Sequence, residues 1–161
     1  MSDYVKQLVV DISKQQLSLH TPEQILHYPV STALKGTGQM HGSGKTPTGR
    51  HKVKIKIGQG CPSNTVFVGR RPTGEVFSDQ LMQSNPQRDW ILSRIIWLTG
   101  LESGINRCGK VDTLSRYIYI HGCPDAEPMG IPRSHGCIRM RNDDIISLFE
   151  LIDNGTEVLI K

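Results

Sequence analysis

Two stretches in the C-terminal part of the chain decide the fold: Arg116-Tyr-Ile-Tyr-Ile-His-Gly122 and Ser134-His-Gly-Cys-Ile-Arg-Met140. Alternating aromatic and β-branched residues at 117–120 predict a strand that leads directly into His121. Cys137 follows a glycine in a turn between a Gly/Pro-rich segment and a helix start, so backbone N–H groups and the helix dipole face the thiol. Both effects favour the thiolate and predict a lowered pKa for a nucleophilic cysteine.

A nucleophilic cysteine needs a base within hydrogen-bond reach. His121 lies 16 residues before Cys137, at the end of the predicted strand, and is the first candidate. His135 shares a face with Cys137 if the segment is extended, so it is retained as a second candidate. From residue type alone, a cysteine is more often a small buried hydrophobic residue, and the nucleophile hypothesis needs support from the rest of the chain.

Apolar and polar residues alternate at intervals of two in several short runs, which is typical of β-strands. The predicted strands are residues 8–12, 16–19, 25–32, 51–57, 91–98, 117–120 and 156–160. The first three form a meander. Residues 35–49 contain five glycines and predict a loop, and residues 58–88 predict an irregular stretch.

One helix is predicted near the C-terminus. Asn142 is a typical N-cap residue, and the carboxylates of Asp143 and Asp144 suit the positive end of the helix dipole. Asn154-Gly155 is a C-cap signal. The predicted apolar face comprises Ile145, Ile146, Leu148, Phe149, Leu151 and Ile152. The expected fold is therefore mainly β (α+β), a single domain over residues 1–161 with one helix packed on the sheet.

The composition excludes several classes of protein. The chain has 161 residues, of which 37% are hydrophobic and 21% charged, as is typical of one globular domain with a sizeable core. It contains no apolar run of 18 residues, so no membrane span is expected. The net charge of +4 suits an anionic substrate, but the basic residues at 51–56 alternate along a strand and do not cluster. Nucleic-acid binding is therefore not expected.

Two motifs point to other functions and are rejected. Gly44-Lys45-Thr46 resembles the end of a phosphate-binding loop, but Gln39 stands where that motif needs glycine, and Pro47 follows where it needs a helix. Two His-x-Cys pairs, at 121–123 and 135–137, offer four zinc ligands, yet their spacing differs from the short pairs of zinc knuckles. We expect neither a metal nor a cofactor.

The cysteines and the N-terminus bear on the compartment. Four cysteines (Cys61, Cys108, Cys123 and Cys137) are too few for a disulfide-dense scaffold. The first 20 residues lack a basic region, a long apolar run and a cleavage site, so no export signal is recognised. If this is the native start, the protein is expected in the cytoplasm with reduced thiols, and a signal peptide on a longer native N-terminus would place it in the periplasm.

Taken in order, the two stretches resemble the catalytic core of the L,D-transpeptidase family, also called YkuD-like. The family pattern is a His, a gap, and then Ser/Thr-His-Gly-Cys with Asn or Arg two residues after the Cys; this chain has His121, residues 134–137 and Arg139. Thr46-Pro-Thr-Gly49 resembles the family's TPTG element before a strand. The gap of 12 residues between His121 and Ser134 is at or just below the short end of the family range, which affects the local loop shape.

The resemblance implies a β-sandwich with a docked C-terminal helix, and it implies a reaction. Cys137 would attack the carbonyl at the L-centre of a meso-diaminopimelate residue in a peptidoglycan stem peptide and expel the terminal D-alanine, with His121 as the base. The carbonyl of Gly122 would orient the imidazole. The backbone N–H groups of Gly136 and Cys137 would form the oxyanion hole.

The resemblance also implies residues that hold the substrate and compounds that block the site. Arg139, Ser134 and His135 would bind the stem peptide, since an arginine suits a two-pronged contact with a carboxylate. The competing interpretation of Arg139 is an ion pair with the aspartates at the helix start. Cys123 lies outside the family pattern and is interpreted as structural or incidental. Carbapenem β-lactams would acylate Cys137 and act as covalent inhibitors.

The acyl-enzyme would react either with water or with the amine of a second stem peptide. Without an export signal, the protein would meet only recycled or precursor muropeptides, so the sequence predicts an L,D-carboxypeptidase that trims tetrapeptide stems to tripeptides. The alternative is an exported L,D-transpeptidase that forms 3-3 cross-links in peptidoglycan.

Overall fold

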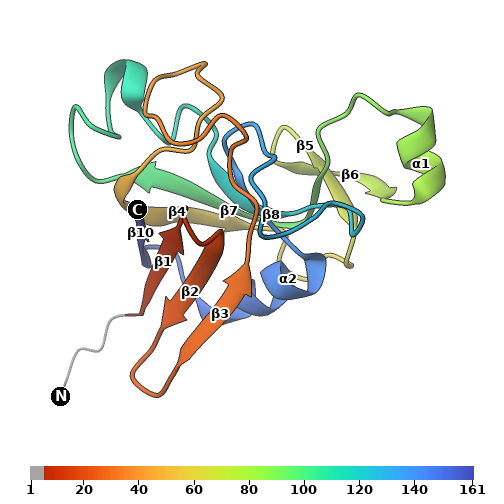
Figure 1. Ribbon diagram of the computed structural model, residues 1–161. Helices are drawn as coiled ribbons and strands as arrows, with labels where there is room; N and C mark the ends of the chain where they lie inside the picture. Colours follow the sequence, from red (N-terminus) through yellow and green to blue (C-terminus); the bar gives the residue numbers. More distant parts are fainter. Residues whose placement is uncertain (1–5) are drawn as a thin grey trace.

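The computed structural model describes residues 6–161 and shows a curved sheet with a C-terminal helix against it (Figure 1). The strands of this part of the chain are β1 Gln7–Asp11, β2 Gln16–His20, β3 Ile25–Pro29, β4 Gly49–Ile57, β5 Thr65–Val68, β6 Arg71–Val76, β7 Ile91–Gly100, β8 Tyr119–Gly122, β9 Ile138–Met140 and β10 Glu157–Ile160. Its helices are α1 Asp79–Ser84, α2 Asn142–Leu151 and the 3-10 turn η1 Gly109–Val111. None of these helices within residues 6–161 has the length and apolar character needed to cross a membrane. The prediction of a mainly β fold is confirmed.

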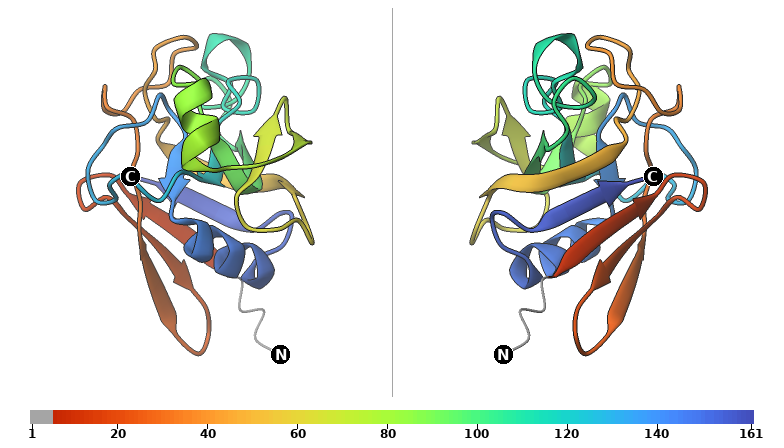
Figure 2. Two further views of the ribbon diagram at one scale, coloured as in Figure 1. Left: turned by 90° about the vertical axis from the view of Figure 1, so that its right-hand side faces the viewer. Right: turned by 90° about the vertical axis from the view of Figure 1, so that its left-hand side faces the viewer.

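The two ends of the described chain meet in the sheet. The strand order is β3-β2-β1-β10-β4-β7-β5-β6, and β8 pairs with β7 and β9. The predicted meander is present, because β1, β2 and β3 are antiparallel neighbours. β1 is parallel to β10, with Leu8 opposite Val158 and Val10 opposite Ile160. Figure 2 shows these two strands side by side.

The main core lies between the sheet and α2. The helix packs on β7 and β8, and its buried apolar residues are Ile145, Leu148 and Phe149. The strands contribute fully buried Leu8, Val10, Leu17, Leu19, Ile96, Leu98, Ile120 and Ile138 to the same cluster. Burial of one such side chain stabilises the fold by about 2 kcal/mol. This core holds β8 and β9 in place beneath the site.

The interpretation of residues 58–88 as irregular is wrong, because this segment contains β5, β6 and α1. The turn between the two strands consists of Gly69 and Arg70, whose φ angles are 57° and 65°. Two successive positive φ angles match the twist of a tight β-hairpin. Most β6 side chains are exposed, so the strand lacks the apolar alternation from which strands are predicted.

The predicted ends of the C-terminal helix also need correction. Arg141 occupies the N-cap position without a side-chain hydrogen bond, and Asn142 lies inside α2. Asn142 is buried, and its carboxamide bonds to other segments and not to the helix start. At the other end, the helix stops at Leu151, which is 37% exposed, and Gly155 with φ 91° belongs to the following turn. The apolar face is therefore narrower than predicted.

The two stretches that decide the fold form adjacent strands. β8 begins at Tyr119, because Tyr117 has φ 57° and ends a turn, so His121 lies within the strand and not after it. Residues 138–140, for which no strand was predicted, form β9. β9 is parallel to β8, and the register places His121 opposite Arg139.

Candidate active site

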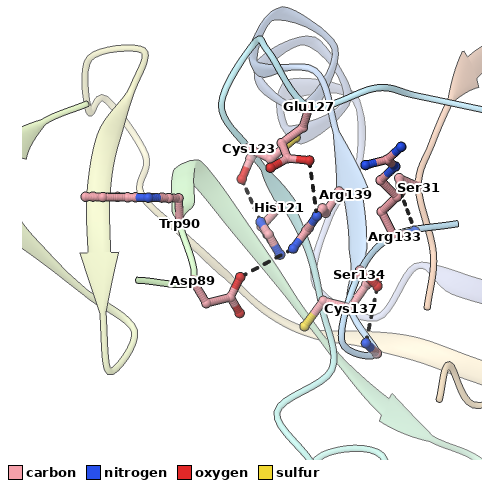
Figure 3. Close-up of polar contacts among 12 residues, drawn as sticks. Ser31, Asp89, Trp90, His121, Cys123, Glu127, Arg133, Ser134, Cys137 and Arg139 are labelled. Atoms are coloured by element: carbon pink, nitrogen blue, oxygen red, sulfur yellow. Dashed lines mark hydrogen bonds and ion pairs between the residues drawn. The ribbon is translucent and has the colours of Figure 1, made fainter. Parts of the chain in front are cut away.

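Cys137 and His121 line one cavity of about 300 Å³. The pairing of β8 with β9 explains their approach, because Cys137 directly precedes β9, and Ile138 at the start of β9 is paired with Ile120 of β8. Figure 3 shows both side chains together with Arg139, although they come from separate strands and a turn. The lining also includes Asp89, Ile91, Arg116, Tyr117, Tyr119, Ser134 and His135. The predicted site residues are thus gathered at one place.

His121 is 1% exposed, and a short contact fixes its ring. Its Nδ1 lies 2.6 Å from the carbonyl oxygen of Gly122, so Nδ1–H donates and Nε2 keeps its lone pair. Burial lowers the pKa of His121, and the Gly122 contact opposes this shift. A Cβ on Gly122 would lie 2.6 Å from the Leu92 carbonyl oxygen and 2.5 Å from Asn142 Oδ1, so only glycine fits there. Because the pKa of His121 is lowered, its ring is a neutral imidazole near pH 7.

The Cys137 sulfur lies between two backbone groups of the β8 segment. The thiol donates to the Tyr117 carbonyl at 3.4 Å, and the Tyr119 N–H donates to the sulfur at 3.4 Å. Burial raises the pKa of the Cys137 thiol to about 12, and the Tyr119 N–H works against the rise. The predicted lowering of this pKa is therefore wrong. The loss of water around the sulfur outweighs the Tyr119 N–H and the charges of Arg139 and Arg116, which favour the thiolate.

Ser134 and Gly136 shape the turn that carries the cysteine. Ser134 is 2% exposed; its hydroxyl donates to the Cys137 carbonyl oxygen at 2.5 Å and accepts from the Gly136 N–H at 3.2 Å. Gly136 has φ 134°, a conformation that favours glycine. Because its N–H is bonded within the turn, Gly136 does not offer a free donor here. The Cys137 N–H is the remaining donor of the predicted oxyanion pair.

Arg139 is held by two carboxylates from different segments. Its guanidinium lies 3.6 Å from Asp89, just before β7, and 3.6 Å from Glu127 in the loop after β8. The side chain is 11% exposed. The competing interpretation, an ion pair with the aspartates at the start of α2, is wrong, because the ion pairs of Arg139 are with Asp89 and Glu127. His135 is exposed and lines the mouth of the cavity next to Arg139.

Of the two His-x-Cys pairs, His121, His135 and Cys137 line the cavity, whereas Cys123 does not. The Cys123 thiol is buried and donates to the Met140 carbonyl at 3.4 Å, and burial raises its pKa to about 12. In residues 6–161, no three His, Cys, Asp or Glu side chains gather in a metal-binding arrangement. The structure thus places Cys123 as a packed side chain away from the cavity.

Three charged residues of the site were missed in the sequence. Asp89, Arg116 and Glu127 lie outside the family motif, and contacts between distant segments bring them to the site. Arg116 had a local signal, because it directly precedes the predicted strand 117–120. Asp89 and Glu127 had no local sequence signal, because each belongs to an irregular segment with other charged residues nearby.

A family model described as the L,D-transpeptidase catalytic domain, YkuD, matches residues 5–160. The match spans nearly the whole chain and includes both stretches that form the cavity. The chain belongs to the L,D-transpeptidase family. The resemblance found in the sequence is confirmed, and this chain is a member of a family of peptidoglycan enzymes.

Two proteins of Bacillus subtilis (strain 168) are similar to this L,D-transpeptidase-family chain over a short segment. "Putative L,D-transpeptidase YqjB" is 48% identical over 48 residues, which are 30% of this chain and 27% of that protein. "Putative L,D-transpeptidase YkuD" is 45% identical over 49 residues, 30% of each chain. The aligned part thus spans less than a third of each relative.

Solved structures of L,D-transpeptidases share the fold. An L,D-transpeptidase from Mycobacterium smegmatis has a TM-score of 0.60 at 15% identity over 98% of this chain and 59% of that one. L,D-transpeptidase 3 from Mycobacterium tuberculosis, in complex with a faropenem-derived adduct, has a TM-score of 0.60 at 18% identity over 98% of this chain and 60% of that one. LD transpeptidase LdtMt1 in complex with imipenem has a TM-score of 0.56 at 15% identity over 98% of this chain and 59% of that one. At these identities the likeness establishes the L,D-transpeptidase fold alone.

Proposed function

We propose that this chain is a cysteine-dependent L,D-carboxypeptidase that removes the terminal D-alanine from tetrapeptide stems of muropeptides through a Cys137 acyl-enzyme. The observation that carries the proposal is the shared cavity, into which both the Cys137 thiol and the His121 imidazole open. Family membership supports a peptidoglycan stem peptide as the substrate.

The reaction divides into acylation and hydrolysis. His121 Nε2 accepts the thiol proton while the sulfur attacks the carbonyl carbon at the L-centre of the third residue. The bond to D-alanine then breaks, and the imidazolium returns the proton to the departing amine, which leaves a thioester on Cys137. Water attacks the thioester, His121 moves its proton to the leaving sulfur, and the tripeptide is released with a free carboxyl group.

The two reacting groups are neutral at rest. Burial raises the pKa of the Cys137 thiol and lowers the pKa of His121, so neither group carries a charge near pH 7. Proton transfer is therefore coupled to attack on the bound substrate, and no standing thiolate–imidazolium pair is needed. Gly122 supports this proton transfer, because its carbonyl oxygen accepts from Nδ1–H of His121 and leaves Nε2 free to accept the thiol proton.

Arg139 supports recognition of a carboxylate on the stem peptide. Its two ion pairs are 3.6 Å long, longer than direct hydrogen bonds, and the guanidinium has five N–H donors. A substrate carboxylate can therefore replace Asp89 or Glu127 as a partner of Arg139. His135 stands at the mouth of the same cavity, where it can contact the bound peptide, whereas the Ser134 hydroxyl is already used by the turn.

The acceptor of the acyl group separates two functions. The exposed His135 lines the same cavity, which supports access of water to the thioester. A second function, formation of 3-3 cross-links by an L,D-transpeptidase, is favoured by a neighbouring hollow of about 250 Å³. This hollow shares Asp89, His135 and Arg139 with the Cys137 cavity and offers room for an acceptor amine.

Incubation with a meso-diaminopimelate-containing tetrapeptide tests the proposal. We expect D-alanine and tripeptide in equal amounts as the products detected by mass spectrometry. Cys137→Ala removes the nucleophile and abolishes release. Cys123→Ala is the matched control and keeps its activity, because that thiol donates to the Met140 carbonyl and does not line the cavity. Accumulation of peptide dimers would instead support the cross-linking function.

A carbapenem gives an independent measure of the same nucleophile. We expect wild type and Cys123→Ala to gain the mass of one carbapenem molecule and Cys137→Ala to gain none. Absence of both D-alanine release and carbapenem addition in a folded wild-type protein would overturn the acyl-transfer proposal altogether.

A further inference from the structure

Arg116 brings to the Cys137 cavity a positive charge that no carboxylate of residues 6–161 neutralises. The side chain is half-buried and lines the cavity directly. Within the described residues, no Asp or Glu forms an ion pair with it. Burial without a carboxylate partner lowers the pKa of Arg116, and the neighbouring Cys137 works against this shift. A half-buried cation of this kind is costly to the fold unless an anion forms nearby.

Neutral groups hold the guanidinium of Arg116 in place. Its two terminal nitrogens donate only to the loop of residues 38–45. These contacts are Gly38 O at 3.2 Å, Gln39 O at 3.2 Å, Ser43 Oγ at 3.4 Å and Lys45 O at 2.6 Å. The same loop continues into Thr46, whose hydroxyl donates to the Gly136 carbonyl at 2.9 Å, next to the cysteine. The loop therefore fixes the charge of Arg116 beside the nucleophile without cancelling it.

The charges on the other side of the cavity do not favour an anion. Arg139 carries one positive charge, and its partners Asp89 and Glu127 carry two negative charges, which leaves a net charge of −1. Adding Arg116 brings the sum to zero. Without Arg116, a thiolate on Cys137 would form beside a net negative charge, and like charges raise the pKa of an acid.

The thiol itself contacts the segment that carries Arg116. Its donor bond goes to the Tyr117 carbonyl, the residue after Arg116. The other titratable or charged side chains that line the cavity are Asp89, Tyr117, Tyr119, His121, His135 and Arg139. Among these charges, Asp89 raises the pKa of Cys137, whereas Arg139 and Arg116 lower it. Of these two cations, Arg139 is already paired with two carboxylates in the described part of the chain and Arg116 is not.

We propose that Arg116 is a positioning residue that stabilises the Cys137 thiolate by its charge, and that the loop of residues 38–45 holds it for this purpose. The inference deepens the proposed function and rests on Cys137 as the nucleophile. The loop of residues 38–45 then contributes to the chemistry, because its hydrogen bonds fix the position of the Arg116 guanidinium.

The test is the rate of Cys137 alkylation by iodoacetamide between about pH 7 and pH 9, followed by mass spectrometry of the peptide that contains Cys137. This range lies below the pKa of the thiol, so the rate follows the thiolate fraction, and no peptide substrate is needed. For Arg116→Gln we expect the rate at each pH to fall by about tenfold, as for a rise of about one unit in the pKa of Cys137. Arg116→Lys restores the charge with fewer hydrogen bonds and should recover most of the rate. Arg107→Gln is the matched control, an exposed arginine of a neighbouring loop outside the cavity, and should leave the rate unchanged.

Thermal unfolding of each variant shows that the compared proteins are folded. An unchanged alkylation rate in folded Arg116→Gln overturns the inference. Equal rates for Arg116→Lys and Arg116→Gln also overturn it, because loop anchoring and not charge would then be the cause. If wild type releases no D-alanine but the alkylation rate of Arg116→Gln falls as expected, the proposed function is contradicted and the electrostatic role of Arg116 is supported.

Discussion

Burial acts in opposite directions on the two reacting side chains. It raises the pKa of Cys137, which is charged when deprotonated, and lowers the pKa of His121, which is charged when protonated. The neutral form of each group is favoured for the same reason, the loss of water around a charge. Charges that reach the cavity from elsewhere, such as Arg116, therefore decide how easily the thiolate forms.

A second buried histidine controls stability and not chemistry. The His51 side chain is 0% exposed; its Nδ1 lies 3.0 Å from the Gly49 carbonyl oxygen and its Nε2 lies 2.9 Å from the Thr113 hydroxyl. Burial lowers the pKa of His51 to about 4, and the Gly49 contact opposes the shift. The ring is thus neutral in the folded protein and links β4 to the loop before β8.

We predict that His51 makes the fold sensitive to acid. The unfolded chain takes up a proton near pH 6.5, whereas the folded chain does so near pH 4, so the contribution of His51 is complete above about pH 6.5 and is lost as the pH falls toward 4. The loss is about 3 kcal/mol across this window. Urea unfolding at pH 7 and 4.5 measures it. His51→Gln should lose less stability between the two pH values, and an equal loss in both proteins would contradict the assignment.

At the scale of elements, one side chain ties α2 to the rest of the molecule. The Asn142 carboxamide accepts from the Ser93 hydroxyl in β7 at 2.6 Å and donates to the Cys123 carbonyl after β8 at 2.9 Å. It also donates to Asn64 and Asp125 at 3.1 Å. These bonds join the helix to β7, to the loop before β5 and to the loop after β8, and the last of these continues into the segment that carries Glu127.

We predict that Asn142→Ala lowers the free energy of unfolding by about 2–3 kcal/mol, because the buried Ser93 O–H then loses its acceptor and the Cys123 carbonyl loses the Asn142 donor. Urea denaturation measures the loss. Asp143→Ala is the matched control in the same helical turn; Asp143 is exposed, so its removal should cost about 0.5 kcal/mol through the helix dipole alone. Similar costs for both substitutions would show that Asn142 acts only as a helix-start residue.

The elements that the sequence predicts well are those whose burial is visible in their own residues. β1, β2, β4 and β7 show regular apolar positions, and each lies close to its predicted range. β6 and α1 were missed, because their side chains are mostly exposed or polar and little of their own pattern marks them. β9 was missed for another reason: its three residues become a strand only by pairing with β8.

At the scale of the whole molecule, one core joins both ends of the described chain. Leu8 and Val10 of β1 share an apolar cluster with Phe149 of α2 and with Val158 and Ile160 of β10. β1 and β10 also form a parallel ladder within the sheet. Loosening either end therefore exposes part of the core that supports β8.

We predict that the chain unfolds in a single cooperative transition. Far-ultraviolet circular dichroism and tryptophan fluorescence should report the same urea midpoint, because Trp90 and Trp97 lie in or beside β7 at the centre of the sheet. Val158→Ala should shift both midpoints together by the same amount. Two separate transitions would contradict the prediction of one domain over residues 1–161.

The sequence by itself determined the class of fold, the order of the motif and the chemical type of the site. Those properties depend on residues close together in the chain: the alternation of the strands, and the spacing of His121, Ser134 and Cys137. Only the tertiary structure decided the direction of the Cys137 pKa, the carboxylate partners of Arg139 and the uncompensated charge of Arg116. These properties depend on which distant segments exclude water or bring charge to a group, and local sequence does not contain that information.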